Sequence, residues 1–263
     1  MDLGISGRTA LVTGASRGIG LAVAETLARE GVHIAIVARD AAGLEKAALE
    51  LRVRHDIKSL AIPGDLSHAD EIPALVAHAA DALGPIDILV TNAGGPPSGP
   101  FEKIGAADWD RATDVTLGSV VALCRETLPR MKERRWGRIV HLTSVSVKQP
   151  LSGLVLSNAL RAAVAGLSKT LAEEYASFGI TVNCVATGWT DTDRLGEIAE
   201  AAAKARGVTP EDVRAGWIAT IPAGRLARAE EIADTAAFLA SERAAYVNGA
   251  VVAVDGGFCR GLL

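Results

Sequence analysis

Residues 13–20 read Thr13-Gly14-Ala15-Ser16-Arg17-Gly18-Ile19-Gly20, and this glycine-rich stretch decides the fold. The apolar run 9–12 precedes it, a helix-like segment begins near Ile19, and a second apolar run, 33–37, completes a strand-helix-strand unit. The glycines allow a tight turn, and the free N–H groups that open the helix attract a phosphate. We therefore predict a phosphate loop in which a dinucleotide contacts Gly14, Ser16, Arg17, Gly18, Ile19 and Gly20. An ordinary glycine-rich turn is the alternative.

The composition predicts a single domain. Of the 263 residues, 49% are hydrophobic and 22% are charged, and no linker-like stretch divides the chain, so residues 1–263 are expected to form one dinucleotide-binding domain. The apolar runs are too short to span a bilayer. The N-terminus lacks a basic region followed by an apolar segment, and we therefore expect a cytoplasmic location.

Charge and cysteine content exclude several classes of site. The net charge of −4 argues against a nucleic-acid surface. The one basic cluster is expected to mark the C-terminal end of a helix, and it comprises Lys132, Arg134, Arg135 and Arg138. Three unevenly spaced cysteines, Cys124, Cys184 and Cys259, suggest neither a disulfide framework nor a metal site.

Short β-branched runs alternate with helical segments along the whole chain. The seven predicted strands are Thr9–Val12, His33–Val37, Ser59–Ile62, Ile86–Val90, Arg138–Thr143, Thr181–Val185 and Ala250–Val254. This alternation predicts an α/β fold of the doubly wound Rossmann type, with seven mostly parallel strands and helices on both faces. Ligands of such folds lie beyond the carboxyl ends of the strands.

Polar residues follow several of these strands and are candidates for contacting the cofactor. After the second strand, Ala38 occupies the position where an NAD site usually has a carboxylate, and Arg39 follows it. Because Arg39 and Arg17 together suit a 2′-phosphate, we expect NADP(H), with NAD(H) as the less favoured cofactor. Asp65 and Leu66 after the third strand, and Asn92, Ala93 and Gly94 after the fourth, are expected to rim the cofactor. Ordinary turn chemistry also explains each group.

With these residues in place, the chain resembles the short-chain dehydrogenase/reductase family, particularly its 3-oxoacyl-carrier-protein-reductase-like members, over nearly its whole length. Six motifs occur in the family's order and spacing: TGASRGIG at 13–20, TNAG at 91–94, GRIVHLTS at 137–144, ITVNCVATGWTDTD at 180–193, IPAGRLARAEEIA at 221–233 and VDGG at 254–257. The resemblance adds Gly188 and Thr190 to the expected cofactor contacts, although Thr187 replaces the family's Pro before Gly188.

The resemblance also implies a catalytic group of Asn, Ser, Tyr and Lys. In the family the Tyr exchanges the substrate proton, the Lys lowers its pKa and holds the nicotinamide ribose, the Ser positions the substrate oxygen and the Asn holds a water. Ser144 matches the Ser. Ser157 stands at the Tyr position, Arg161 at the Lys position and Thr116 at the Asn position. Three of the four catalytic positions are therefore expected to be altered, with Arg161 still able to hold the cofactor ribose.

These exchanges affect proton transfer more than cofactor binding. A serine hydroxyl is much less acidic than a tyrosine, and an arginine with a pKa above about 12 is a poor proton shuttle. Lys148 and His141 are near enough in the sequence to replace the missing proton donor. The preferred interpretation is that Lys148 is a solvated loop lysine and that His141 is a histidine at the edge of the core. Tyr175 lies about five helical turns beyond Ser157 and is excluded.

Three functions follow from this pattern. The preferred one is an NADP(H)-dependent oxidoreductase that acts on a carbonyl or alcohol through an altered catalytic group. The alternative is a non-catalytic NADP(H)-binding protein, a sensor or partner subunit. A cofactor-free lyase resembling the halohydrin-dehalogenase-like proteins fits poorly, because those proteins keep the Tyr and lose the glycine loop.

The segment 190–221 is expected to form a lid. It contains an alanine-rich helix from Leu195 to Arg206 and a second helix capped by Thr209. Its apolar residues either contact a hydrophobic substrate or pack the lid on the body. We also expect a homotetramer or homodimer, with no nucleic-acid or membrane partner, because the resemblance covers the helices near 109–134 and 155–178. Small residues that would allow close helix contact are Ala159, Ala162, Ala163 and Ala172.

Overall fold

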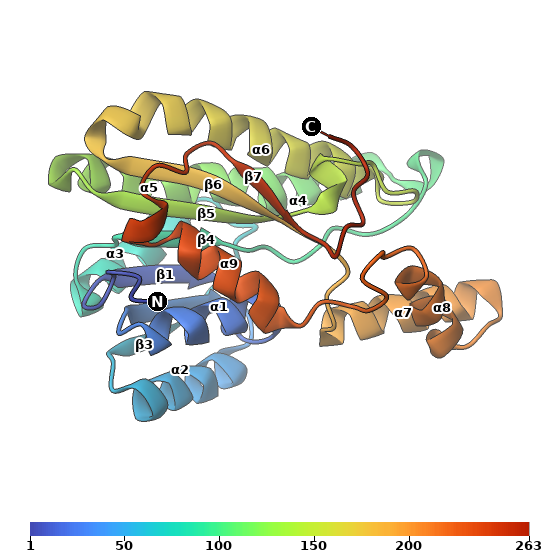
Figure 1. Cartoon of the computed structure of the whole chain (residues 1–263), viewed down its shortest axis with the longest axis horizontal. Coiled ribbons are helices and arrows are strands. Elements are labelled where there is room, and N and C mark those ends of the chain that lie inside the picture. The colour runs from blue at the N-terminus through green and yellow to red at the C-terminus, as the bar shows by residue number, and fades with distance from the viewer. Residues whose placement is uncertain (263) are drawn as a thin grey trace.

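A seven-stranded parallel sheet, in the order β3-β2-β1-β4-β5-β6-β7, forms the centre of the chain (Figure 1). The computed structural model describes residues 1–262. The strands are β1 (Thr9–Thr13), β2 (His33–Ala38), β3 (Ser59–Pro63), β4 (Ile88–Thr91), β5 (Gly137–Ser144), β6 (Ile180–Thr187) and β7 (Val251–Val254). Sequential order reverses between β1 and β4, which is the point where doubly wound sheets bind ligands.

Helices cover both faces of the sheet. They are α1 (Gly18–Arg29), α2 (Ala41–His55), α3 (Ile72–Leu83), α4 (Ala106–Thr113), α5 (Ser119–Arg134), α6 (Val155–Tyr175), α7 (Asp193–Arg206), α8 (Pro210–Ile218) and α9 (Ala229–Leu239). Short 3-10 turns are η1 (Phe101–Lys103), η3 (Val145–Val147), η4 (Ala176–Phe178) and η5 (Glu242–Ala244), and η2 (Asp114–Gly118) is a π-helical turn.

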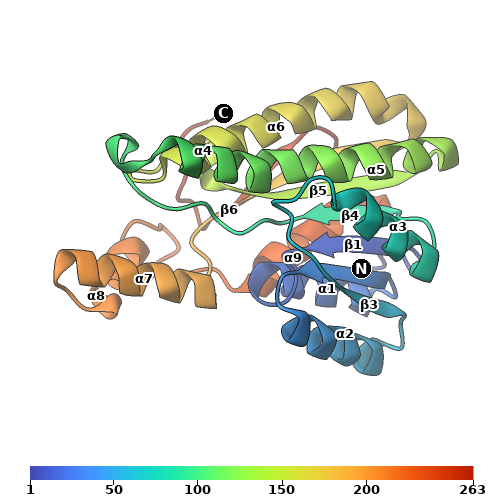
Figure 2. The ribbon, with the colours of Figure 1, turned by 180° about the vertical axis from the view of Figure 1, so that it is seen from behind.

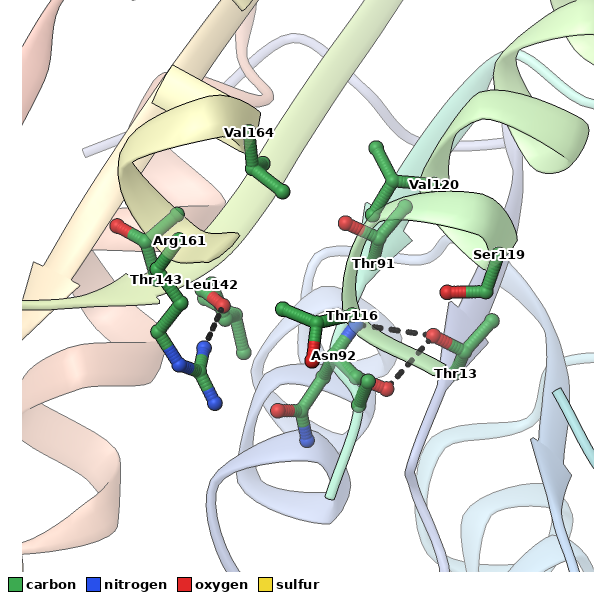
Figure 3. A pocket seen from close by; sticks show the side chains of 11 residues that line it. Thr13, Thr91, Asn92, Thr116, Ser119, Val120, Leu142, Thr143, Arg161 and Val164 are labelled. Atoms are coloured by element: carbon green, nitrogen blue, oxygen red, sulfur yellow. Dashed lines mark hydrogen bonds between the residues drawn. The ribbon is translucent and has the colours of Figure 1, made fainter. Parts of the chain in front are cut away.

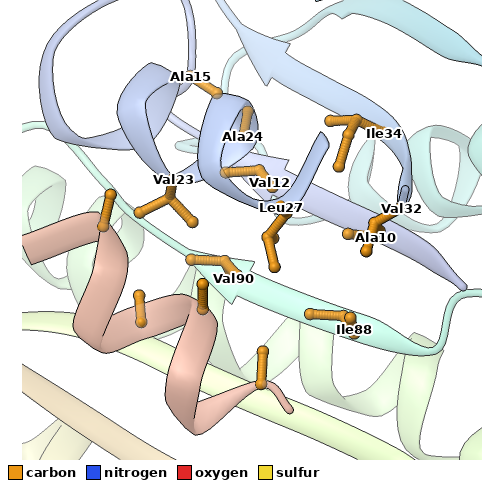
Figure 4. Packing of buried hydrophobic residues seen from close by; sticks show 14 of the residues in the cluster. Ala10, Val12, Ala15, Val23, Ala24, Leu27, Val32, Ile34, Ile88 and Val90 are labelled. Atoms are coloured by element: carbon orange, nitrogen blue, oxygen red, sulfur yellow. The ribbon is translucent and has the colours of Figure 1, made fainter. Parts of the chain in front are cut away.

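Two hydrophobic cores hold these layers together. Residues of α1, α2 and α9 pack on one face of the sheet (Figure 4), and residues of α3, α5 and α6 pack on the other. Successive strand residues serve opposite cores: Val12 faces α1, whereas Leu11 faces α3 and α5, and both are fully buried. Each such side chain contributes about 1.5–3 kcal/mol by burial. The strands therefore present their carboxyl ends from a rigid support.

The predicted fold class is confirmed, and each predicted strand lies within two residues of an observed one. The interpretation of the basic cluster is wrong for Arg138. Lys132 and Arg134 do end α5, but Arg138 lies on β5, where only 3% of its side chain is exposed and it pairs with Glu242 at 3.3 Å. Its aliphatic stem and the stacking of its guanidinium on Trp136 make burial favourable.

Helices α7 and α8 stand apart from the three layers in both views (Figures 1 and 2). They pack on each other through Ala199, Ala203 and Val213. The predicted cap is present, because Thr209 Oγ1 accepts a hydrogen bond from Asp212 N at 3.1 Å and Thr209 N donates to the Asp212 carboxylate. Their remaining apolar residues surround Trp217, which stacks on Trp189 with ring centroids 4.7 Å apart.

Within residues 1–262, no helix has the length and apolarity that crossing a membrane requires. The three cysteines are unpaired, and His, Cys, Asp and Glu side chains form no cluster suited to a metal ion in this described part of the chain.

Candidate active site

The glycine-rich loop connects β1 to α1 through backbone that favours glycine. Gly14 and Gly18 have φ angles of 59° and 60°, in the left-handed region. A Cβ on Gly20 would collide with the carbonyl oxygen of Gly14. The loop therefore needs glycine both for its turn and for close contact between its two ends. Ser16 and Ile19 are half-buried, and Arg17 is exposed.

Asn92, at the end of β4, fastens this loop to the sheet. Its side-chain Nδ2 donates to the carbonyl oxygen of Gly14 at 3.1 Å, and its backbone exchanges two 2.9 Å hydrogen bonds with Thr13 Oγ1. A Cβ on Gly14 would lie 2.6 Å from the Asn92 carbonyl oxygen. Asn92 thus positions the loop. Beside it, Ala93 is half-buried and Gly94 is exposed, and a Cβ on Gly94 would meet open space.

The residues after β2 and β3 lie at the same edge of the sheet. Arg39 is exposed, and Asp40 instead caps α2 by accepting a hydrogen bond from Gly43 N at 3.1 Å. Asp65 accepts from the backbone and hydroxyl of Ser67, and these bonds, together with the nearby charge of Arg39, hold the pKa of its carboxyl below the usual value. Leu66 is buried. Arg39 is free of salt bridges among residues 1–262.

A pocket lies next to the loop, at the carboxyl ends of β1, β4 and β5 (Figure 3). It is lined by Thr13, Thr91, Asn92, Ala93, Thr116, Ser119, Val120, Leu142, Thr143, Arg161 and Val164. The free space inside it is about 10 Å³, close to the least that can hold one water molecule. The pocket therefore joins the cofactor loop to two of the predicted catalytic positions, Thr116 and Arg161.

Thr116 brings an unsatisfied hydroxyl to this pocket. Only 4% of the residue is exposed, and its Oγ1 lacks a hydrogen-bond partner among the described residues. It lies in the π-helical turn between α4 and α5, a kind of turn that often occurs at functional sites. A buried hydroxyl without a hydrogen-bond partner lowers the stability of the fold unless a ligand or a water molecule bonds to it. Thr116 is thus available to bind a polar group that enters the pocket.

Arg161 extends from α6 into the same space (Figure 3). Its Nη1 donates to the carbonyl oxygen of Leu142 at 3.0 Å, and it pairs with no carboxylate in the described chain. Burial lowers the pKa of the Arg161 guanidinium, because the charged form is poorly solvated there. Arginine nevertheless stays protonated in proteins. The pocket therefore contains an uncompensated positive charge.

Ser146 lies between Ser144 and Ser157 near the pocket and links them by hydrogen bonds. Ser144 Oγ accepts from Ser146 N at 3.2 Å, which caps the turn η3. Ser157 is 9% exposed, and its hydroxyl lies 3.5 Å from Ser146 Oγ. No motif in the sequence marks Ser146, so it was not among the predicted site residues. Ser146 contacts both predicted catalytic serines.

The remaining candidate residues from the sequence lie in the core, on an exposed loop or in the segment after β6. His141 is fully buried rather than at the core edge, with Nδ1 2.7 Å from Thr91 Oγ1, and burial lowers its pKa to about 4. Lys148 is exposed on the loop after η3. Gly188 packs closely on Asp255, because a Cβ on Gly188 would lie 2.7 Å from the Cα of Asp255. The hydroxyl of the buried Thr190 donates to the carbonyl oxygen of Gly188 at 3.0 Å.

This arrangement fits a dinucleotide. A Cβ at Gly14 or Gly20 would fill the bend of the loop, whereas Gly94 faces open space in which a ligand meets no side chain. Free N–H groups open α1, because Arg17 at its N-cap forms no capping hydrogen bond. The loop, the helix and the positive pocket together define a nucleotide-dependent α/β protein.

Residues 14–259 match the family described as enoyl-(acyl carrier protein) reductase, and the chain belongs to the short-chain dehydrogenase/reductase family. Nodulation protein G of Rhizobium sp. (strain N33) is 39% identical over 256 residues, covering 96% of this chain and 97% of that protein. The 3-oxoacyl-(acyl-carrier-protein) reductase FabG of Pseudomonas aeruginosa is 37% identical, covering 97% and 98%. The crystal structure of Gluconobacter frateurii L-sorbose reductase with NADPH and L-sorbose has a TM-score of 0.95 at 35% identity, covering both chains completely. The predicted family is confirmed.

Proposed function

We propose that this chain is an NADP(H)-dependent oxidoreductase that acts on a carbonyl or alcohol through an altered catalytic group. One observation carries the proposal: the glycine-rich loop opens into a pocket that contains the Arg161 guanidinium and the unsatisfied Thr116 hydroxyl. The L-sorbose reductase that shares the fold was solved with NADPH, which supports the same cofactor here. When bound, the cofactor supplies or accepts a hydride at the substrate carbon.

The residues that would hold NADP(H) surround the loop. Backbone N–H groups at Gly18 to Gly20 would bind the pyrophosphate, and Arg17 and Arg39 would bind the 2′-phosphate. Asp65, Leu66, Ala93 and Gly94 would rim the adenosine and ribose, with Gly188 and Thr190 near the nicotinamide. Asn92 would act through the loop that it fastens. The glycines themselves are constrained by the protein, because a Cβ on Gly14 would meet Asn92 and a Cβ on Gly20 would meet Gly14.

The altered catalytic group would work by charge more than by acid strength. Ser144 and Ser157 stand at the family's Ser and Tyr positions, and Ser146 hydrogen-bonds Ser144 and lies beside Ser157. Arg161 would stabilise negative charge on the substrate oxygen, because it remains a cation in a poorly solvated pocket. Thr116 would hold a water that carries the proton. Losing a tyrosine acid typically lowers a rate by about 10²–10⁴.

A non-catalytic NADP(H)-binding protein is the second candidate. It is favoured by the contacts of the two replaced positions, since Ser157 is buried beside Ser146 and Arg161 is bound to the carbonyl oxygen of Leu142. Both side chains then have structural partners without any substrate.

Titration with NADPH separates these candidates. Fluorescence transfer from the four tryptophans reports binding. Single-turnover oxidation of NADPH with a panel of ketones and sugars then reports catalysis. Binding followed by oxidation supports the oxidoreductase, and binding without oxidation selects the non-catalytic protein. Absence of binding would overturn both and favour the cofactor-free lyase.

We also propose that α7 and α8 form a lid over the substrate. Their apolar residues gather around the Trp189–Trp217 stack. Ile221, Leu226 and Phe258 belong to the same cluster, which supports packing of the lid on these neighbouring segments of the chain. A homo-oligomer is proposed from the exposed Ala159, Ala162 and Ala163 on α6 and from β7 at the sheet edge. Ala172 does not belong to this surface. It is 4% exposed, because the segment after α9 covers it.

A further inference from the structure

Two carboxylates of α7 form salt bridges with Arg17 of the glycine-rich loop. Arg17 Nη2 donates to Glu197 Oε1 at 3.1 Å, and Arg17 Nη1 lies 3.7 Å from Asp193 Oδ2. Arg194 donates to the other Glu197 oxygen at 3.1 Å. The hydrogen bonds from Arg194 and then Arg17 keep the pKa of Glu197 below its usual value, so this carboxylate is ionised at neutral pH.

The start of α7 lies directly against the phosphate loop. A Cβ built on Gly18 would be 3.6 Å from Cγ2 of Thr192, the residue that caps α7. Farther along, α7 packs on α8 through small apolar residues. Within residues 1–262, the two Arg17 pairs are the salt bridges that join α7 to the loop. A change in the charge around Arg17 therefore alters the contacts that hold the start of α7 against the loop.

We propose that Glu197 and Asp193 compete with the cofactor's 2′-phosphate for Arg17, and that α7 thereby sets the preference for the phosphorylated dinucleotide. This rests on the proposed NADP(H) dependence. A phosphate that arrives beside Arg17 and Arg39 meets two fixed negative charges and must displace at least one of them. An unphosphorylated ribose leaves the pairs intact. Glu197 and Asp193 are thus specificity-determining residues that act through Arg17.

The competition must be reciprocal. If the two carboxylates weaken binding of the 2′-phosphate, the phosphate weakens the contact between Arg17 and α7 by the same factor. The Arg17 side chain is 59% exposed, so solvent screens the pairs and the effect is moderate. Binding of the phosphorylated cofactor is then expected to release the first turns of α7.

The affinities for NADPH and NADH test this competition. The double variant Glu197→Gln/Asp193→Asn removes both charges while keeping side-chain size, and tryptophan fluorescence transfer measures each Kd. We expect NADPH to bind about three- to tenfold more tightly and NADH to change less than about twofold. Glu200→Gln, on the exposed part of the same helix, is the matched control and leaves both values unchanged. Equal changes for the two cofactors, or weaker NADPH binding, would overturn the proposal.

Hydrogen exchange of α7 gives a second readout that does not involve turnover. Adenosine 2′,5′-bisphosphate should accelerate exchange at the start of α7 in the parent, and adenosine 5′-monophosphate should not. In Arg17→Ala the same amides should exchange rapidly with or without the bisphosphate. Unchanged exchange despite bound bisphosphate would contradict the inference. A parent that binds NADPH but oxidises none of it refutes the oxidoreductase and leaves the competition standing. A parent that binds neither NADPH nor the bisphosphate refutes both.

Discussion

The glycine-rich loop and the adjoining pocket differ in how tightly their atoms are constrained. In the loop, Gly14 and Gly20 contact each other's backbone, and Asn92 uses its amide nitrogen and its backbone to fix them. In the pocket, Thr116 has an unsatisfied hydroxyl, and Arg161 has a single hydrogen bond to the protein. A constrained backbone excludes nearly every substitution, whereas side chains with few hydrogen bonds to the protein can be exchanged with a smaller loss of stability. We therefore expect cofactor binding to survive the exchange of proton-transfer residues that we propose.

Placing Tyr and Lys at the two positions that we propose to be altered should produce the largest effect. We expect Ser157→Tyr/Arg161→Lys to raise the single-turnover rate of NADPH oxidation with a ketone by about 10²–10⁴-fold, because it supplies an acidic hydroxyl and its cation. NADPH affinity should stay within about tenfold, since the loop is unchanged. Ser157→Phe/Arg161→Lys, with the same ring and no hydroxyl, is the control. A fast parent that Ser157→Ala slows strongly would show that Ser157 is itself the catalytic group.

The buried His141, which hydrogen-bonds Thr91, should make the fold sensitive to acid. The folded His141 has a pKa of about 4 and the unfolded residue an ordinary value near 6.5, so only the unfolded chain gains a proton between these limits. Stability is fully present above about pH 6.5 and falls by about 3 kcal/mol as the pH drops to about 4. Urea unfolding at several pH values should show a shallower loss in His141→Gln. The exposed His78→Gln should follow the parent, and an unchanged slope in His141→Gln would contradict this assignment.

A single methyl group in the loop should test its constraint. Gly20→Ala places a Cβ against the Gly14 carbonyl oxygen, so we expect a loss of about 1–3 kcal/mol in unfolding free energy and weaker NADPH binding. Thermal unfolding and the fluorescence titration measure the two effects. Gly216→Ala on α8 meets no atom within 4 Å and should be tolerated. If the Gly20 variant matches Gly216→Ala in both measurements, the loop is less constrained than the geometry indicates.

The smallest expected change concerns the cofactor's second phosphate. Arg39→Asp replaces an attractive charge by a repulsive one, and we expect the preference for NADPH over NADH to fall by about tenfold or to reverse. The ratio of the two dissociation constants is the measurement. Arg52→Asp, an exposed exchange on α2, controls for the overall change in charge. Equal affinities of the parent for both cofactors would remove the basis for this prediction.

Local sequence patterns predicted the fold well, because β-branched runs and the glycine-rich loop are determined by nearby residues. The strand predicted at Ile86 begins at Ile88, where pairing with β1 starts. Side-chain contacts between residues far apart in the sequence were harder to predict. Arg17 and Glu197 are 180 residues apart, and no motif links them. Ser146 was missed because its role depends on how η3 turns beneath α6.

The π-helical turn Asp114–Gly118 has a consequence for insertions and deletions in this part of the chain. Such a turn contains one residue more than an α-helical turn, and it joins α4 to α5 without a break. The wide turn accommodates this extra residue, so deleting one residue within it would restore a regular helix with little rotation. Deleting one residue from the regular helix beside it would instead rotate α4 relative to α5 by about 100°. Trp109 and Ala112 would then leave their contacts with α6, and Thr116 would turn away from the pocket. The length of this helix, as much as the identity of its side chains, therefore keeps the pocket in register with the cofactor loop.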